Sequence, residues 1–84
     1  MDQKIKRGAE LGKNIKSLRL ETGFGVTELS VRMQLSGCDI TRESLNKIEA
    51  GKQNITSTQL RCFVQTFGIS YNEFFRFLEE EHHG

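Results

Sequence analysis

The chain has 84 residues, with 12 Lys and Arg against 11 Asp and Glu for a net charge of +1, and it contains neither Pro nor Trp. This length allows one small domain, and a composition of 36% hydrophobic and 27% charged residues is that of a folded chain rather than a disordered one. No apolar run approaches the roughly 20 residues that cross a bilayer, and the basic N-terminus lacks the apolar segment of a signal peptide, so a cytoplasmic protein outside the membrane is expected.

Charge is distributed unevenly along the chain. Residues 1–8 are predicted to be a flexible basic arm, residues 9–78 to be the folded domain, and residues 79–84 (EEEHHG) to be a disordered acidic and histidine-containing tail. A basic N-terminal part and an acidic C-terminal part suggest a polyanionic partner on one side of the domain.

The first two helices are predicted from apolar residues at helical spacing. The first begins near Ala9 and ends before Gly23, which suits the position after a helix C-terminus, and its inner positions are Leu11, Ile15, Leu18 and Thr22. The second follows Gly25 and ends near Gln34 or Leu35, with an inner face made of Val26, Leu29, Ser30 and Met33.

A third helix is predicted after the loop 36–39. Thr41 suits its N-cap, Ile40 can act as an apolar staple to Leu45, and the helix should run to Ala50 with Gly51 after it. Its apolar side holds Leu45 and Ile48, and its polar side holds Arg42, Glu43, Asn46 and Lys47.

Two more helices complete the prediction. Thr56 and Gln59 form a T-x-x-Q capping box before an apolar stripe of Leu60, Phe63, Val64 and Phe67 that Gly68 ends. Ser70 and Glu73 form a second box before a fifth helix, whose inner face is expected to hold Tyr71, Phe74, Phe75 and Leu78. No segment alternates like a strand, so the expected fold is all-α, a compact bundle of five short helices.

The two cysteines, Cys38 and Cys62, have no CxxC spacing. We expect free thiols in a reducing compartment, with Cys38 inert rather than redox-sensitive.

Several short pieces in this order resemble the phage repressor/Cro family of helix-turn-helix proteins, also called the XRE family. The pieces are LGKNIKSLRLETG, TELSVRM, ITRESLNKIEAGK and FGISYNEFF, and together they run from Leu11 to about Phe75. The resemblance implies a lambda-repressor-like DNA-binding domain in which the second and third helices form the helix-turn-helix, and it implies a bacterial or phage transcriptional regulator that is repressor-like.

The resemblance also implies that helix 41–50 lies in the major groove of duplex DNA. Arg42 and Lys47 would donate to guanine O6 and N7, Glu43 would accept from a cytosine amino group, and Asn46 would contact adenine or a phosphate. These four residues are the expected base contacts.

Phosphate contacts are expected around this helix. The candidates are Thr41, Ser44, Lys52, Gln53 and Asn54, together with the backbone amides of Val26 and Thr27. The basic arm, with Lys4, Lys6 and Arg7, either reaches the backbone or minor groove or is a solvated terminus.

Arg19 and Glu49 both fall at the margin of an apolar helix face, where a charge needs a partner. In the family that the chain resembles, these two positions form an ion pair between helices one and three, and the resemblance implies the same pair here. It would orient the polar helix without touching DNA.

The sequence departs from the family pattern in two places. Gly25 and Val26 stand where the family usually has a Ser/Thr-type cap followed by a phosphate-binding Gln, so the side chain of Val26 cannot make that contact. The span from Leu29 to Thr41 is about five residues longer than the usual turn, so either the second helix is extended or the loop is wider, and Asp39 falls near its tip.

No catalytic carboxylate pair, Cys/His couple, phosphate loop or metal-ligand spacing is present, so an enzyme, a cofactor, a metal and a small-molecule ligand are not expected.

The apolar residues near the C-terminus, Phe75, Phe77 and Leu78, provide more apolar surface than one small core needs, and we expect them to form a homodimer interface. Two alternatives stay open: a protein-interaction module of antitoxin or antirepressor type, and the DNA-binding piece of a longer regulator.

Overall fold

A computed structural model describes residues 8–75. They form α1 (Gly8–Thr22), α2 (Val26–Leu35), α3 (Arg42–Glu49), α4 (Ser57–Phe67) and a last helical segment at residues 71–75, with no strand in this range. The all-α fold and its five helices therefore agree with the sequence prediction. The arm, the tail, Phe77 and Leu78 lie outside the described residues.

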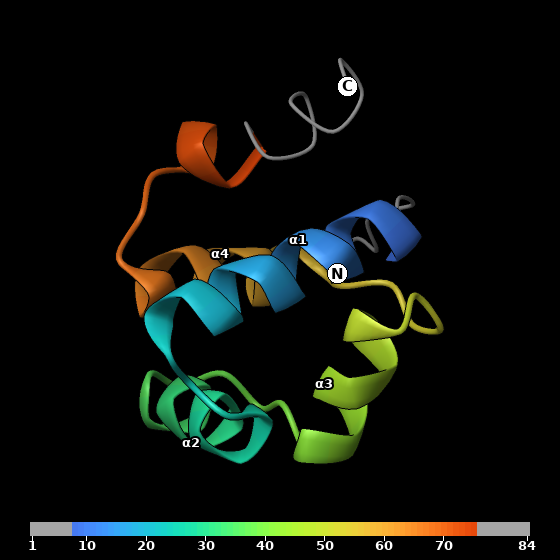
Figure 1. Cartoon of the computed structure of the whole chain (residues 1–84). Helices are drawn as coiled ribbons and strands as arrows, with labels where there is room; N and C mark the ends of the chain where they lie inside the picture. The colour runs from blue at the N-terminus through green and yellow to red at the C-terminus, as the bar shows by residue number, and fades with distance from the viewer. Residues whose placement is uncertain (1–7, 76–84) are drawn as a thin grey trace.

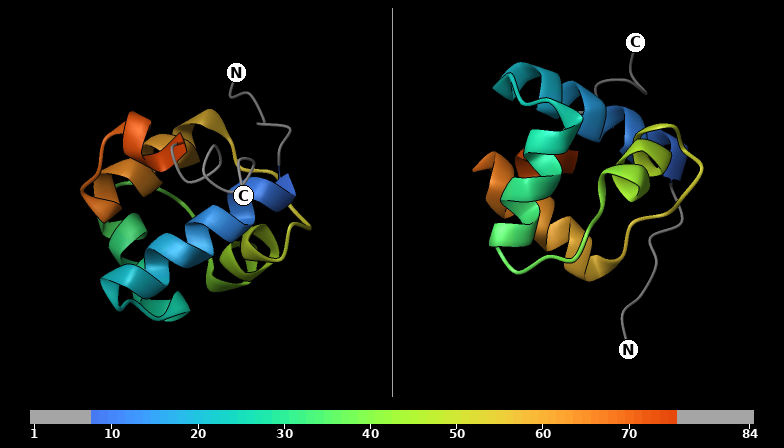
Figure 2. Two further views of the ribbon diagram at one scale, coloured as in Figure 1. Left: turned by 45° about the horizontal axis from the view of Figure 1, so that its top comes forward. Right: turned by 90° about the horizontal axis from the view of Figure 1, so that it is seen from below.

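The helices are arranged in two halves around α1. In Figure 1, α2 and α3 lie on one side of α1 and α4, and the segment 71–75 lies on the other side. The view from below in Figure 2 shows α2 and α3 joined by the connection 36–41. The surface formed by α2 and α3 is thus remote from the segment 71–75.

All four helices end in the same backbone motif, in which a glycine with positive φ follows the helix. After α2, the amide of Gly37 donates to the carbonyl of Gln34 at 3.0 Å, and the amide of Cys38 donates to the carbonyl of Met33 at 2.9 Å. These are the two bonds of a Schellman motif, which satisfies carbonyls that the helix end would leave free. The repeated motif explains why such short helices have sharp ends and short connections.

One core fills the space between the helices. Its most buried large side chains include Leu11, Ile15, Leu29, Leu45 and Phe63, each at most 1% exposed. These five residues lie at the apolar positions expected from helical spacing. The core also contains residues that this spacing did not predict, such as Ile55 in the α3–α4 connection. No helix in this range is both long and apolar enough to cross a membrane.

Gly12 sets how closely α1 approaches α3. A Cβ atom built on Gly12 would lie far inside van der Waals contact with the carbonyl oxygen of Ile48, and 3.2 Å from that of Glu49. Only glycine allows the two backbones to pack at this distance. The position of α3 therefore depends on a residue that has no side chain.

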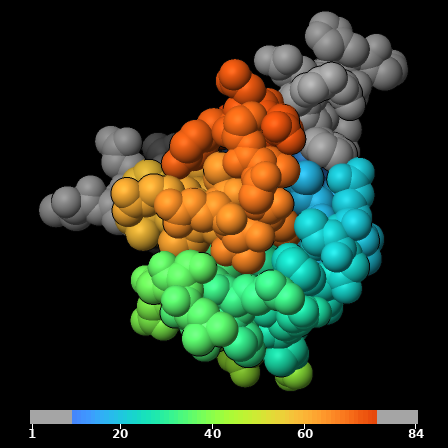
Figure 3. Space-filling view, turned by 90° about the vertical axis from the view of Figure 1, so that its left-hand side faces the viewer, coloured from blue at the N-terminus to red at the C-terminus, as the bar shows by residue number. Residues whose placement is uncertain are grey.

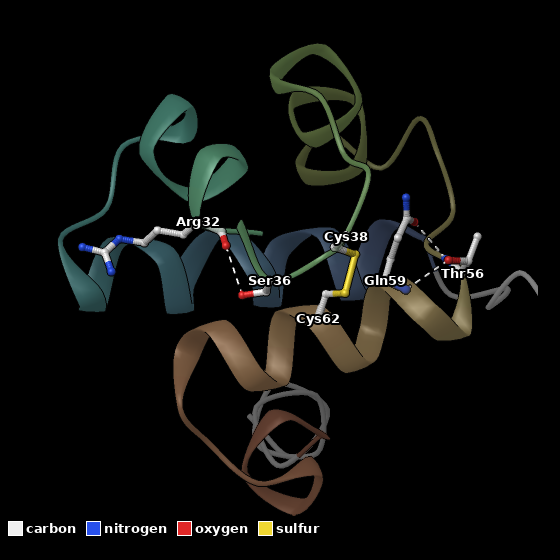
Figure 4. The surroundings of a disulfide bond; sticks show 6 residues. All are labelled: Arg32, Ser36, Cys38, Thr56, Gln59 and Cys62. Atoms are coloured by element: carbon white, nitrogen blue, oxygen red, sulfur yellow. Dashed lines mark hydrogen bonds between the residues drawn. A yellow bond between two sulfur atoms is a disulfide. The ribbon is translucent and has the colours of Figure 1, made fainter. Parts of the chain in front are cut away.

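The cysteines are not free, contrary to the expectation from their spacing. Cys38 and Cys62 are joined in a disulfide, with 6.2 Å between their Cα atoms and a sequence separation of 24. Figure 4 shows the bond between the α2–α3 connection and the middle of α4. The pairing results from the packing of α4 against α2, which no local spacing rule describes.

Tyr71 also departs from its predicted place. We expected it on the inner face of the fifth helix, but its side chain is 46% exposed, whereas Phe74 is fully buried and Phe75 is partly buried. The core instead receives Ile69 from the preceding turn. The turn and the segment together therefore contribute residues 69, 74 and 75 to the core.

Candidate nucleic-acid interface

The polar side of α3 faces solvent along its whole length. The backbone amide of Ser44 donates to the Thr41 hydroxyl oxygen at 3.0 Å, so Thr41 is the N-cap that the sequence predicts. Leu45 and Ile48 are buried at 0% and 1% exposure. The four expected base-contacting side chains are all exposed on the opposite side: Arg42, Glu43, Asn46 and Lys47.

Arg19 and Glu49 join α1 to α3. The Nε atom of Arg19 donates to Oε2 of Glu49 at 2.7 Å, and its terminal nitrogen donates to Oε1 at 2.9 Å, which is a bidentate ion pair. The side chains are only 10% and 7% exposed. A third bond runs from Arg19 to the carbonyl of Phe24 at 3.0 Å.

The environment of this pair stabilises its charged form. The hydrogen bonds that Arg19 donates to the Glu49 carboxylate raise the pKa of the Arg19 guanidinium; burial acts in the opposite direction, and the attraction between the two charges adds to the increase. The Arg19 guanidinium is therefore charged at any physiological pH.

The residues expected to contact phosphate lie at both ends of α3. Thr41, Lys52 and Asn54 are exposed, whereas Ser44 and Gln53 are partly buried. The Thr41 hydroxyl accepts the capping bond, so its own proton stays available to an external acceptor. Lys52 follows the Schellman turn of α3, where its amide donates to the carbonyl of Lys47 at 2.8 Å.

The N-terminus of α2 is open. Its N-cap, Gly25, makes no side-chain capping bond, so the first amides of the helix have no such partner. The side chain of Val26 packs partly against the core, and Thr27 is exposed. The side chain of Val26 carries no donor, so Val26 can offer an anion only its backbone amide, whereas Thr27 also has an exposed hydroxyl.

A surface hollow is lined by the start of α2 and by the C-terminal part of α3, and it includes a residue that the sequence analysis did not select. Lys16, Val26, Asn46 and Glu49 are among its lining residues. Lys16 is exposed and lies three residues before Arg19, hence on the same side of α1. This three-residue spacing from Arg19 is the sequence signal that could have identified Lys16 as a cation close to the C-terminal end of α3.

The sequence left open whether the extra residues between α2 and α3 extend the second helix or widen the loop, and the structure shows both. The helix continues to Leu35, and the loop that follows extends over residues 36–41. The amide nitrogen of the Gln34 side chain donates to the carbonyl of Ile40 at 2.7 Å and holds the loop against α2. Asp39 is exposed at this loop.

The apolar residues expected at a dimer interface are not brought to this surface. Phe75 lies in the segment on the other side of α1, where it makes an edge-to-face contact with Phe74 at 5.4 Å between ring centroids. Its partners in that expectation, Phe77 and Leu78, lie outside the described residues.

Solved structures with this fold include a restriction-modification controller protein and a gene regulator. The chain matches the restriction-modification controller protein C.Esp1396I, in the tetramer in complex with its natural 35-base-pair operator, with a TM-score of 0.77 and 24% identity over 90% of this chain and 93% of that chain. The wild-type C.Esp1396I structure gives 0.76 and 24% over 88% of each chain. ClgR, the clp gene regulator from C. glutamicum, gives 0.76 and 18% over 93% and 94%.

No protein-family model and no curated protein matches the chain. The structural matches cover nearly all of both chains, so the helix-turn-helix fold that the sequence motifs implied is confirmed.

Proposed function

We propose that this chain binds double-stranded DNA in a sequence-specific manner and acts as a repressor-like transcriptional regulator in the cytoplasm. The observation that carries the proposal is the side of α3 that bears Arg42, Asn46 and Lys47, which is exposed over the full helix while the other side is buried. The fold is that of C.Esp1396I, which was solved on its operator. The function is therefore one of binding rather than catalysis.

In this proposal α3 is the recognition helix and enters the major groove. Arg42 is its first residue and donates two hydrogen bonds to guanine O6 and N7, and Lys47 donates to the same type of acceptor five residues further along. Asn46 pairs with adenine or a phosphate, and Glu43 accepts from cytosine. The ion pair of Arg19 and Glu49 holds the helix at a fixed angle to α1 while these side chains read bases.

Phosphate contacts position the recognition helix and supply most of the affinity. The α3 end contributes through Thr41, Ser44 and residues 52–54, and the α2 end contributes through the free amides of Val26 and Thr27. The departure from the family pattern at Val26 leaves the α2 end with fewer side-chain donors. We therefore expect the α3 end to dominate the phosphate contacts.

We further propose that the chain acts as a homodimer, with the apolar residues around Phe75 at the interface. The segment 71–75 lies away from α2 and α3, so both surfaces can be occupied at once. Sedimentation of the wild type and of Phe77→Glu tests this proposal. A wild type that stays monomeric at high concentration and on DNA would contradict it.

Titration with a random-sequence duplex at two salt concentrations tests DNA binding. A protein that neutralises phosphates loses affinity as salt rises, with a slope of log affinity against log salt near −0.9 for each phosphate. We expect a steep slope for this chain. Absence of binding even at low salt would favour the protein-interaction module instead.

A further inference from the structure

We propose that Cys38 and Cys62 form a reversible thiol–disulfide site that controls DNA affinity through the position of α3. The inference rests on the proposed function, since it concerns the same recognition helix. Its substrate class is a small dithiol or disulfide of the thiol pool. The argument depends on what the bond connects, what remains when it is broken, and how a small thiol reaches it.

The disulfide joins the segment that leads into α3 to the middle of α4. Cys38 lies four residues before Arg42, the first residue of α3, and the closed loop from Cys38 to Cys62 contains all of α3. Figure 4 shows the bond passing from the connection to α4. No other covalent link holds the start of α3 against the rest of the domain, so the bond acts directly on the end of the helix that would read bases.

The connection keeps its local shape without the bond. The amide of Cys38 donates to the carbonyl of Met33 at 2.9 Å, and the side chain of Gln34 donates to the carbonyl of Ile40 at 2.7 Å. The buried Met33 and Cys38 side chains occupy the positions that pack together in a Schellman motif. Reduction therefore releases the tie between the connection and α4, while the turn and both helices keep their local backbone structure and the position of α3 relative to α4 is no longer fixed by a covalent bond.

A small thiol can reach the bond from the surface. The cysteines are only 3% and 6% exposed, but Cys38 lines a surface hollow together with Gln34, Gly37 and Asp39. Gly37 has no side chain to close this hollow. Figure 3 shows the junction at which the end of α2 and the following loop meet α4. The limited exposure restricts attack to small reagents.

The chemistry is a balanced two-electron exchange. The thiolate of an external dithiol attacks one sulfur of the Cys38–Cys62 bond, which forms a mixed disulfide and releases the other cysteine as a thiolate. The second thiol of the reagent then displaces the remaining cysteine, and the protons lost by the reagent pass to the two protein thiolates. The products are two protein thiols and the oxidised reagent, and a low-molecular-weight disulfide drives the reverse reaction.

The reducing cytoplasm keeps most protein thiols reduced, so a bond in this position forms under oxidative conditions. The oxidised form holds the start of α3 in one position and binds its preferred duplex more tightly. We expect a ratio of affinities between the oxidised and reduced forms of about fivefold or more, which is the lower range for coupling between two sites.

The test uses the full chain and a duplex selected from a random pool by the oxidised protein. Affinity is measured by fluorescence anisotropy after equilibration with oxidised glutathione or with dithiothreitol, with the thiol count verified by alkylation and mass spectrometry. Cys38→Ser/Cys62→Ser is the matched control, which should bind like the reduced wild type and should not respond to dithiothreitol. Circular dichroism compares the folding of both wild-type forms, so the test does not depend on the variant.

The reduction potential of the cysteine pair gives a second readout, because DNA would not change this potential if the bond had only a structural role. If oxidation strengthens DNA binding fivefold, saturating DNA must lower the reduction potential of the pair by about 20 mV, because a tenfold change corresponds to 29.6 mV for two electrons. Glutathione titrations with and without the selected duplex measure this shift.

Three results would overturn the inference, and they are distinguishable. If oxidised glutathione forms no bond, or if both forms bind the selected duplex equally, the inference is wrong while the proposed function stands. If neither form binds any duplex at low salt, the proposed function fails and the inference fails with it. The inference is supported if the oxidised wild type binds the selected duplex more tightly than the reduced wild type and if the double variant binds equally under both conditions.

Discussion

Two ion pairs in this domain show how strongly location determines what a charged residue contributes. Glu28 and Arg32 pair on the outside of α2 at 3.1 Å, with side chains that are about half exposed. Arg19 and Glu49 pair at 2.7 Å with side chains that are 10% and 7% exposed. An exposed pair contributes little, whereas loss of one partner from a buried pair leaves an uncompensated charge.

We therefore expect Glu49→Gln to lower the free energy of unfolding by about 3 kcal/mol, near the lower end for a broken buried pair because the glutamine oxygen still accepts a bond. Glu28→Gln is the matched control and should change stability by no more than about 0.5 kcal/mol. Thermal unfolding followed by circular dichroism measures both. Unchanged melting temperature and unchanged DNA affinity in Glu49→Gln would contradict the role of the pair.

Gly12 controls the same α1–α3 contact through space rather than charge. Alanine at this position would gain about 1 kcal/mol of helix propensity, but its methyl group would overlap the backbone carbonyl of Ile48. Since backbone cannot move aside as a side chain can, we expect Gly12→Ala to destabilise the domain by about 1–3 kcal/mol net. Denaturant unfolding measures this value, with Lys13→Ala at the exposed neighbouring position as the control. A Gly12→Ala variant more stable than the wild type would contradict the close packing of α1 against α3.

At the scale of elements, α3 depends on its ends and on its neighbours. It has eight residues, which is too short to be stable alone in water. Thr41 caps its start, and the turn at Gly51 satisfies its last carbonyls. The helix is thus defined by caps and packing, and its exposed residues are free to vary in chemistry without loss of the fold.

Two capping threonines allow the capping role to be separated from the DNA role. Thr41 caps α3 and Thr56 caps α4 in a full capping box, so Thr41→Ala and Thr56→Ala should each lower stability by about 1 kcal/mol. Only Thr41→Ala should also weaken duplex binding, because its hydroxyl lies at the proposed phosphate contacts. Anisotropy titrations at a temperature where both variants are folded distinguish the two roles, and equal DNA affinity in the two variants would argue against a phosphate contact by Thr41.

At the scale of the whole molecule, a buried polar side chain attaches the last segment to the domain. Asn14 on α1 is 1% exposed, and its amide nitrogen donates to the backbone carbonyl of Phe74. A buried carbonyl that loses its donor costs free energy. The segment that we propose for the dimer interface is therefore fixed to α1 by a specific bond as well as by apolar packing.

Asn14→Ala should lower stability by about 1–3 kcal/mol and should loosen the segment 71–75 more than the rest of the domain. Hydrogen exchange measured by mass spectrometry gives the protection of this segment separately. Asn72→Ala is a suitable control, since Asn72 lies in the same segment and its side chain is exposed. Wild-type protection of 71–75 in Asn14→Ala would show that packing alone holds the segment.

Local patterns were sufficient to predict the helices, their caps and the exposed side of α3. Leu45 and Ile48 differ from Arg42 and Lys47 by helical phase alone, and Thr56 with Gln59 is a sequence-local signal. The pair of Arg19 and Glu49 was implied by the family resemblance. The contact at Gly12, the bond from Asn14 and the disulfide were not predicted, because each depends on how two helices cross in space.

The exposed side of α3 is the central claim, and specificity measurements on Arg42→Ala and Lys52→Ala test it most directly. For each variant, affinity is measured for the selected duplex and for a random duplex at one salt concentration. Arg42→Ala should reduce the preference for the selected duplex by about 1–3 kcal/mol, whereas Lys52→Ala should weaken both duplexes alike. If Arg42→Ala also weakens both duplexes alike, Arg42 contributes only its charge and does not read the base sequence from α3.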